Sequence, residues 1–250
     1  MKLLKLGGSV ITNKKGRCEA NLQNIEKLAK MLGELWALGE RDIVLVHGAG
    51  SFGHALVIEK NLQGKLGKER LADVREVQRE CANLSEIVVS NLRKNGIAAQ
   101  RVAAHEIIDS KNGRIFNIDK SAIHELLENE KMPVLYGDMV DDFGLGFSVC
   151  SGDQIIANLS EDADFTVLGT DVDGILIEGK VVEKIDSTEF EKIKNHLGRS
   201  GSPDVTGGML GKINEMKEVG GRYFVVNANY PQRIADILRG KKVLYTKLDF

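Results

Sequence analysis

Short runs of apolar residues alternate with longer amphipathic segments along this chain of 250 residues. Several short runs are continuously apolar, which is typical of strands covered on both faces of a sheet. The pattern predicts strands at residues 2–6, 42–47, 98–103, 132–137, 164–169, 222–227 and 242–246. The longer segments repeat apolar residues at helical spacing and predict helices at residues 21–39, 70–96, 119–130, 153–161 and 231–240.

This alternation of strands and helices predicts an α/β fold with a mostly parallel sheet and helices on both sides. The segment "GILIEGKVVEKI" (174–185) differs, because two alternating runs flank a Gly-Lys pair and predict a β-hairpin. The segment "MVDDFGLGFSVC" (139–150) is a second hairpin candidate. Neither a repeat period nor a low-complexity linker divides the chain, so we expect one domain over residues 1–250, with two lobes that divide near residue 160.

Composition excludes several classes of protein. The formal net charge is -2, which argues against the basic surface that nucleic acid or an anionic membrane requires. Cys18, Cys81 and Cys150 lie far apart without a C-x-x-C pair, so we expect buried thiols in a reducing compartment. The N-terminus is interrupted by Lys5 and two glycines, and no apolar run approaches the roughly 18 residues that span a bilayer. A soluble cytoplasmic protein is therefore expected.

The stretch "DIVLVHGAGSFGHA" (42–55) follows a predicted strand with the spacing G-x-G-x-x-G at Gly48, Gly50 and Gly53. A dinucleotide site would need an acidic residue about 20 residues further on, at the end of a second strand. That region is charged and helical here, so the pattern disfavours such a site. A tight turn without a ligand would explain one or two glycines. It does not explain three glycines packed with a serine and His54 into seven residues.

A second glycine loop, "KLGGSVITNK", follows the first predicted strand. Gly7 and Gly8 leave backbone N–H groups able to face an anion. Lys5 interrupts an otherwise apolar strand, and Lys14 follows on the far side of the turn. A cation at a buried strand end needs a partner, and a phosphate would serve.

Three further loops carry glycine and charge. In "SGDQIIANL", Gly152 and Asp153 stand at a predicted helix N-terminus, where the acid alone would be interpreted as a cap. In "LGTDVDGIL", two carboxylates follow a strand without the remaining ligands of an EF-hand. The stretch "DVTGGMLGKINE" lacks the P-loop pattern, because isoleucine follows Lys212. Five such loops at strand ends predict one crevice for several phosphates, the arrangement that phosphoryl transfer requires.

The motifs "LKLGGSVIT", "HGAGSFGH", "YGD", "SGDQI", "GTDVDGI" and "DVTGGMLGK" occur in this order across nearly the whole chain. Together they resemble the amino acid kinase superfamily and, within it, the family of isopentenyl phosphate kinases. The "HGAGSFGH" loop is the discriminating piece, since acetylglutamate and glutamate kinases differ there. The resemblance implies an αβα sandwich with an N-terminal acceptor lobe (about 1–160) and a C-terminal nucleotide lobe (about 161–250). It implies a homodimer that uses ATP and Mg²⁺ to phosphorylate isopentenyl phosphate in isoprenoid biosynthesis.

By position, the resemblance also implies roles for individual residues. The catalytic set is Lys5, Lys14, His54 and Asp153. Acceptor binding falls to Gly8, Ala49, Gly53, His54 and Gly152. Nucleotide binding falls to Lys5, Gly7, Gly8, Ser9, Gly50, Thr170, Asp171, Asp173, Gly207, Gly208 and Lys212. Lys5 and Lys14 would bridge the donor and acceptor phosphates, His54 would bind the acceptor phosphate, and Asp153 would orient the lysines. No metal ligand from the protein is expected.

The implied chemistry needs no general base, because a phosphate monoester with a second pKa of about 6 is largely dianionic at neutral pH. The harder task is to bring two polyanions together, which lysines and glycine N–H groups would offset. We expect His54 to hydrogen-bond the acceptor phosphate and His47 to be structural. The helix after His54 and residues 74–89 are candidates to line a prenyl pocket. Two alternatives stay open: a kinase for another phosphate or a phosphonate such as fosfomycin, and a nucleotide-binding storage or sensor protein.

Overall fold

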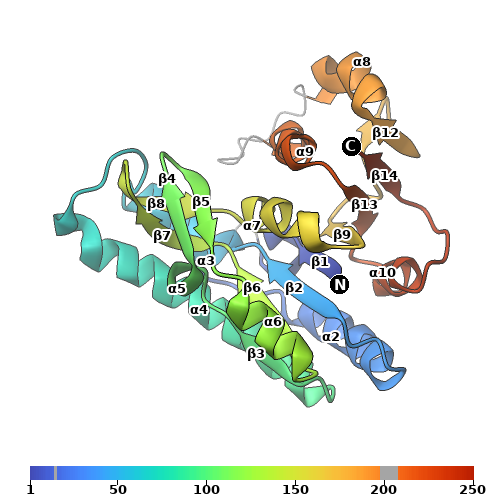
Figure 1. The fold of residues 1–250 in the computed structure, drawn as a ribbon, viewed down its shortest axis with the longest axis horizontal. Helices are drawn as coiled ribbons and strands as arrows, with labels where there is room; N and C mark the ends of the chain where they lie inside the picture. Colours follow the sequence, from blue (N-terminus) through green and yellow to red (C-terminus); the bar gives the residue numbers. More distant parts are fainter. Residues whose placement is uncertain (14–15, 198–207) are drawn as a thin grey trace.

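The computed structural model describes residues 1–13, 16–197 and 208–250, and an eight-stranded sheet crosses the molecule (Figure 1). Its strand order is β12-β14-β13-β9-β1-β2-β6-β3, and every neighbouring pair is parallel except β13 with β14. The strands are β1 (Lys2–Leu6), β2 (Ile43–His47), β3 (Ala99–Arg101), β6 (Met132–Tyr136), β9 (Phe165–Thr170), β12 (Lys184–Asp186), β13 (Arg222–Asn227) and β14 (Thr246–Asp249).

Helices cover both faces of this sheet. One apolar cluster joins it to α2 (Leu22–Ala37), α4 (Leu71–Lys94) and α10 (Pro231–Leu238). A second cluster joins the opposite face to α6 (Ser121–Glu128), α7 (Gly152–Leu159), α8 (Ser187–Leu197) and α9 (Gly208–Val219). Short helices α1 (Gly8–Ile11), α3 (Gly50–Glu59) and α5 (Ala104–Ile107) complete the layers. This arrangement confirms the predicted αβα sandwich with a mostly parallel sheet.

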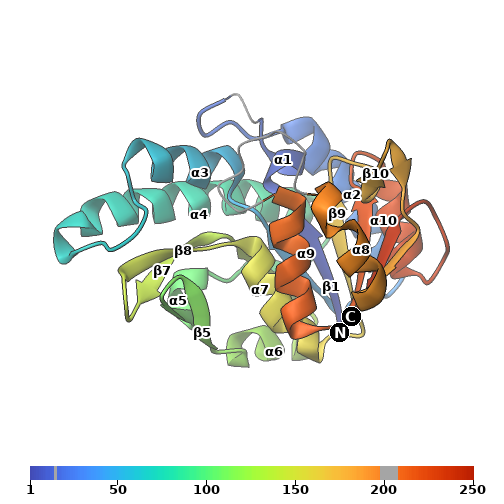
Figure 2. The same cartoon turned by 90° about the horizontal axis from the view of Figure 1, so that it is seen from above.

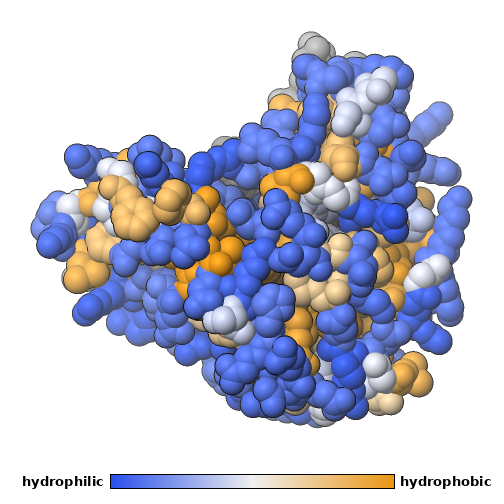
Figure 3. Space-filling view, in the orientation of Figure 1, coloured by the Kyte–Doolittle hydropathy of each residue, from blue (hydrophilic) through white to orange (hydrophobic). Residues whose placement is uncertain are grey.

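A second sheet projects from the central one on the left of Figure 1, with the strand order β5-β4-β7-β8. Its strands are β4 (Ile108–Lys111), β5 (Arg114–Ile118), β7 (Asp138–Asp142) and β8 (Gly146–Cys150). The hairpin of β7 and β8 is as predicted, and so is a short one formed by β10 (Leu176–Ile177) and β11 (Lys180–Val181). Figure 3 shows the surface hollowed between this sheet and the region of α8 and α9.

The main deviation from the predicted elements lies near the C-terminus. The predicted strand at 242–246 is wrong, because the ladder with β13 begins only at Thr246. Val243 and Tyr245 instead pack their side chains against the core without joining the sheet. Their alternation with exposed residues therefore gives the same sequence pattern as a strand. The sequence patterns also missed α8 and the hairpin of β4 and β5, whose strands alternate poorly. No helix in the described part of the chain combines the length and apolarity needed to cross a bilayer.

The side chain of Asp142 connects the two hairpins of the second sheet. Its carboxylate accepts hydrogen bonds from the backbone N–H groups of Asn112 (2.9 Å), Gly113 (2.7 Å), Gly144 (2.8 Å) and Leu145 (2.8 Å). Burial alone would raise the pKa of this carboxyl, but the backbone donors outweigh it and lower the pKa to about 2. One side chain therefore locks the turns of two hairpins to each other.

We expect Asp142→Asn to lower the free energy of unfolding by about 2 kcal/mol at pH 7, because it removes charged acceptors from several N–H donors. The folded-state pKa lies below the unfolded value of about 3.9, so this contribution is present above pH 4 and is lost as pH falls toward 2. Denaturant unfolding across this pH range checks the prediction. The control is Asp141→Asn at the exposed neighbouring position; an equal loss in both variants would contradict it.

Candidate functional site

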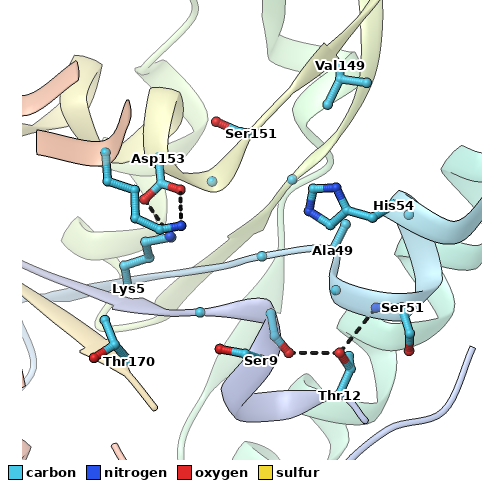
Figure 4. Close-up of a pocket in the computed structure, with 18 of the residues that line it drawn as sticks. Lys5, Ser9, Thr12, Ala49, Ser51, His54, Val149, Ser151, Asp153 and Thr170 are labelled. Carbon is cyan, nitrogen blue, oxygen red and sulfur yellow. Dashed lines mark hydrogen bonds and ion pairs between the residues drawn. The ribbon is translucent and has the colours of Figure 1, made fainter. Parts of the chain in front are cut away.

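Three glycine loops converge at the carboxyl ends of β1, β2 and β9, where they line a cavity of about 700 Å³ (Figure 4). Helices α3 and α7 begin at this cavity, at Gly50 and Gly152. Helix N-termini present backbone N–H groups and a partial positive charge, which favours anions. The predicted crevice at the carboxyl ends of the strands is present.

Glycine is required where the first two loops interlock. A Cβ atom on Gly8 would lie 2.6 Å from Cα of Gly50, and one on Gly48 would lie 2.7 Å from the Gly8 nitrogen. Gly50 also adopts a φ of +50°, and a Cβ there would lie 2.2 Å from Oγ1 of Thr12. The backbones thus approach too closely for any side chain, which leaves their polar groups next to the cavity.

A buried carboxylate with two lysines lines the cavity. Lys5 on β1 places Nζ 2.5 Å from Oδ1 of Asp153, and Lys212 on α9 places Nζ 3.3 Å from Oδ2 (Figure 4). Lys5 and Asp153 are only 6% and 7% exposed. Burial by itself would raise the pKa of Asp153, but the two ammonium groups outweigh it and hold the pKa below its usual range. Lys5, predicted to need an anionic partner, has one in Asp153.

The local sequence explains why Asp153 takes this position. Ser151, not Asp153, caps α7, because its hydroxyl accepts a hydrogen bond from the backbone N–H of Gln154 (3.1 Å). Asp153 is therefore released from capping and turns toward the lysines. Two ammonium groups therefore stand together in the cavity wall, where they can attract an anionic ligand.

His54 lies on α3, one turn after Gly50, and its ring points into the cavity on the side opposite Lys5 and Asp153 (Figure 4). His47 behaves differently. It is fully buried at the end of β2, stacks on Tyr136 with ring centroids 5.7 Å apart, and lies outside the cavity lining. Burial lowers the pKa of His47 to about 4, so it is neutral at physiological pH. These observations agree with a structural role for His47.

The structure brings most of the predicted site residues to one cavity. Its lining includes Lys5, Gly7, Gly8, Ser9, Ala49, Gly50, Gly53, His54, Gly152, Asp153, Thr170, Asp171 and Lys212. Asp173 is not among the lining residues: its Oδ1 binds Nη1 of Arg233 (2.5 Å) and Nδ2 of Asn227 (3.1 Å). Gly208 is the first residue of α9. Lys14 and Gly207 lie outside the described residues.

One end of the cavity is apolar. Its lining there includes Val57 and Ile58 from α3, Val77 and Cys81 from α4, Met139 from β7 and Val149 from β8. The two helices are those predicted to line a prenyl pocket. The contribution of the second sheet was not predicted, because the hairpin pattern alone does not say what the hairpin covers.

Two further polar residues line the cavity, and neither was assigned a role from the sequence. Asp138 lines the cavity and is buried, and its Oδ2 lies 2.6 Å from Nδ1 of His105. Burial raises the pKa of Asp138, and the hydrogen bond from His105 partly offsets this effect. Ser51 is the second: its N–H donates to Oγ1 of Thr12 (3.1 Å), and its hydroxyl donates to the Glu19 carbonyl (3.3 Å). The "YGD" motif was the available signal for Asp138.

The described residues hold no group of three or more His, Cys, Asp or Glu side chains that could bind a metal ion. Asp153, a buried carboxylate of the cavity wall, is already paired with two ammonium groups. These donors do not fit a metal held by the protein alone.

Comparison with known proteins agrees with this geometry. The amino acid kinase family model matches residues 1–223. The chain is 34% identical to isopentenyl phosphate kinase of Methanocaldococcus jannaschii over 261 residues, covering 100% of this chain and 99% of that one. It is also 34% identical to isopentenyl phosphate kinase of Methanothermobacter thermautotrophicus, covering 99% and 98%. Its fold superposes on a solved isopentenyl phosphate kinase with a TM-score of 0.83 and 32% identity, covering 99% of both.

We expect Asp153→Asn to lower the unfolding free energy by about 3 kcal/mol at pH 7, because a buried and a partly buried ammonium group both lose a carboxylate partner. The pKa of Asp153 is held below normal, so its contribution is present above pH 4 and is lost under acid. Unfolding curves at pH 7 and pH 3 measure this difference. Glu161→Gln, at an exposed position just beyond the end of α7, is the control. A variant as stable as the parent at pH 7 would contradict the account.

Proposed function

Since the chain belongs to the amino acid kinase family, we propose that it transfers the γ-phosphoryl group of ATP to isopentenyl phosphate. The product is isopentenyl diphosphate, a precursor in isoprenoid biosynthesis. The observation that carries the proposal is the division of one cavity: a lysine–carboxylate cluster stands at one end and apolar side chains stand at the other. A phosphate monoester with a short hydrocarbon tail matches both ends.

The acceptor phosphate is already ionised, so the reaction does not call for a general base. The main obstacle is repulsion between two polyanions, which for two unit charges about 4 Å apart is about 4 kcal/mol at an effective dielectric constant of about 20. Lys5 and Lys212, whose Nζ atoms both lie beside Asp153 in the cavity wall, would offset this repulsion. Lys14 is assigned the same task from the sequence motif. Asp153 keeps the two observed lysines in place.

His54 would bind the acceptor phosphate. Its ring points into the cavity on the side opposite Lys5 and Asp153, and the cavity lining also includes Ala49, the N-cap residue of the same helix, and Gly53, which precedes His54. An imidazole N–H can donate a hydrogen bond to a phosphoryl oxygen that does not react. This contact would place the acceptor in line with the donor phosphate and favour a phosphate or phosphonate over a carboxylate.

The two lobes would divide the work. Residues of the acceptor lobe, about 1–160, would hold isopentenyl phosphate. Thr170, Asp171, Asp173, Gly207 and Gly208 of the nucleotide lobe, about 161–250, would bind ATP together with Lys212. Mg²⁺ would arrive on the phosphate oxygens of ATP, as it commonly does in kinases. We further propose a cytoplasmic homodimer.

The direct test is incubation of the pure protein with ATP, Mg²⁺ and isopentenyl phosphate, with detection of the diphosphate product. Parallel reactions use fosfomycin, acetylglutamate and UMP as acceptors. We expect turnover of isopentenyl phosphate to exceed that of the other acceptors at least about tenfold, because none of them places a hydrocarbon tail of this length in the apolar end. Preferential turnover of fosfomycin would favour the phosphonate kinase. Nucleotide binding without turnover of any acceptor would favour a storage or sensor protein.

We expect His54→Gln to lower kcat/KM for isopentenyl phosphate at least about tenfold, because a misplaced acceptor phosphate loses both a hydrogen bond and its alignment. The KM for ATP should change little. Steady-state kinetics with each substrate varied in turn separates these effects. His124→Gln, at an exposed position on α6, is the matched control. Turnover of the His54 variant within a factor of two of the parent would show that the role is wrong.

A further inference from the structure

The position of α9 determines where Lys212 stands relative to Asp153. Ile213 and Met216 pack one side of this helix into the core beneath it. Lys217 ties it to α8, through a hydrogen bond of 2.6 Å to Glu191. These contacts fasten α9 to the core and to its own lobe. The side of α9 that faces the acceptor lobe carries Glu215 and Glu218.

Arg114 reaches that side of α9 from the second sheet. Its guanidinium binds Glu215 through Nη1, and Glu218 through Nη2 at 2.9 Å. Glu215 and Glu218 stand three residues apart on the helix, where two like charges repel. One guanidinium between them removes this repulsion and connects residues about one hundred positions apart in sequence.

The turn that precedes Arg114, the first residue of β5, is itself fixed. The N–H groups of Asn112 and Gly113 donate to the carboxylate of Asp142, at 2.9 Å and 2.7 Å. The carbonyl of Gly113 accepts a hydrogen bond from Nε2 of Gln154 on α7, at 3.1 Å. Arg114 therefore extends from a backbone that is held on one side by its own sheet and on the other by α7.

These contacts place α7 between the β4–β5 hairpin and α9, as both ribbon views show (Figure 2). The end of the β4–β5 hairpin contacts both α7, which carries Asp153, and α9, which carries Lys212. We propose that Arg114 is a positioning residue that holds α9 against α7, so that Lys212 stays within reach of Asp153 and of the transferred phosphoryl group. The catalytic part of this inference rests on the proposed kinase function.

Arg114 is not expected to act mainly by stabilising the fold. Arg114 is 51% exposed in its side chain, and exposed ion pairs add little to the free energy of unfolding. The main effect of the contact is to fix the position of α9. Loss of Arg114 should therefore affect α9 and the step that uses Lys212, while leaving the overall fold almost unchanged.

The test compares the full-length parent with Arg114→Ala, with Arg114→Lys and with the charge-swapped pair Arg114→Glu plus Glu215→Arg. Hydrogen exchange over residues 208–219 is measured without substrate. We expect exchange in Arg114→Ala to be about threefold to fivefold faster in this segment, the range that an exposed ion pair supports. Exchange should be unchanged in α2, and largely restored in the charge-swapped pair. Lys111→Ala, on the same hairpin, is the control.

Kinetics with ATP, Mg²⁺ and isopentenyl phosphate provide the second readout. We expect Arg114→Ala to lower kcat about threefold to fivefold and to raise the KM for ATP, with little change in the KM for isopentenyl phosphate or in Tm. Arg114→Lys should be intermediate. If Arg114→Ala leaves hydrogen exchange in α9 unchanged, the inference is wrong, whether or not the parent is active. If the parent is active and Arg114→Ala leaves kcat unchanged, the inference is also wrong. An inactive parent would contradict the proposed function, while the exchange measurement would still test the hold on α9.

Discussion

The carboxylate of Asp153 holds two ammonium groups in the wall of a cavity, and the rest of the site is arranged around that contact. Lys5 comes from the first strand, Asp153 from a helix in the middle of the chain and Lys212 from a helix near its end. A buried charge is costly unless it is paired, so these three elements stabilise one another only when all are in place. The two ammonium groups are what an anionic ligand would meet in this wall.

The glycine loops make this charge accessible. Gly8 and Gly50 approach each other so closely that neither position can hold a side chain, which leaves the backbone as the floor of the cavity. Apolar side chains of α3, α4 and the second sheet close the other end. One cavity therefore combines surfaces of opposite character, and the acceptor that matches both has a charged head and a hydrocarbon body.

Much of this arrangement could be predicted from the sequence. Continuous apolar runs predicted the buried parallel strands, and an isolated Lys5 within such a run predicted a buried cation in need of a partner. The apolar pattern alone does not identify the partner, because Asp153 lies far from Lys5 in the sequence. The family resemblance did identify it, since it implied that Asp153 orients the lysines. The β4–β5 hairpin was missed because its strands are half exposed and alternate poorly. The misplaced C-terminal strand had a different cause: Val243 and Tyr245 are apolar because they cover the core.

The central claim is that one cavity holds the acceptor phosphate at His54 and the donor phosphates at the lysine cluster. A crystal structure with isopentenyl phosphate and a non-hydrolysable ATP analogue tests it most directly. The account predicts the acceptor phosphate within hydrogen-bonding distance of His54, its tail among Val57, Val77 and Met139, and the γ-phosphate beside Lys5 and Lys212. An acceptor bound elsewhere, with the His54 ring turned away from it and the apolar end empty, would contradict the account.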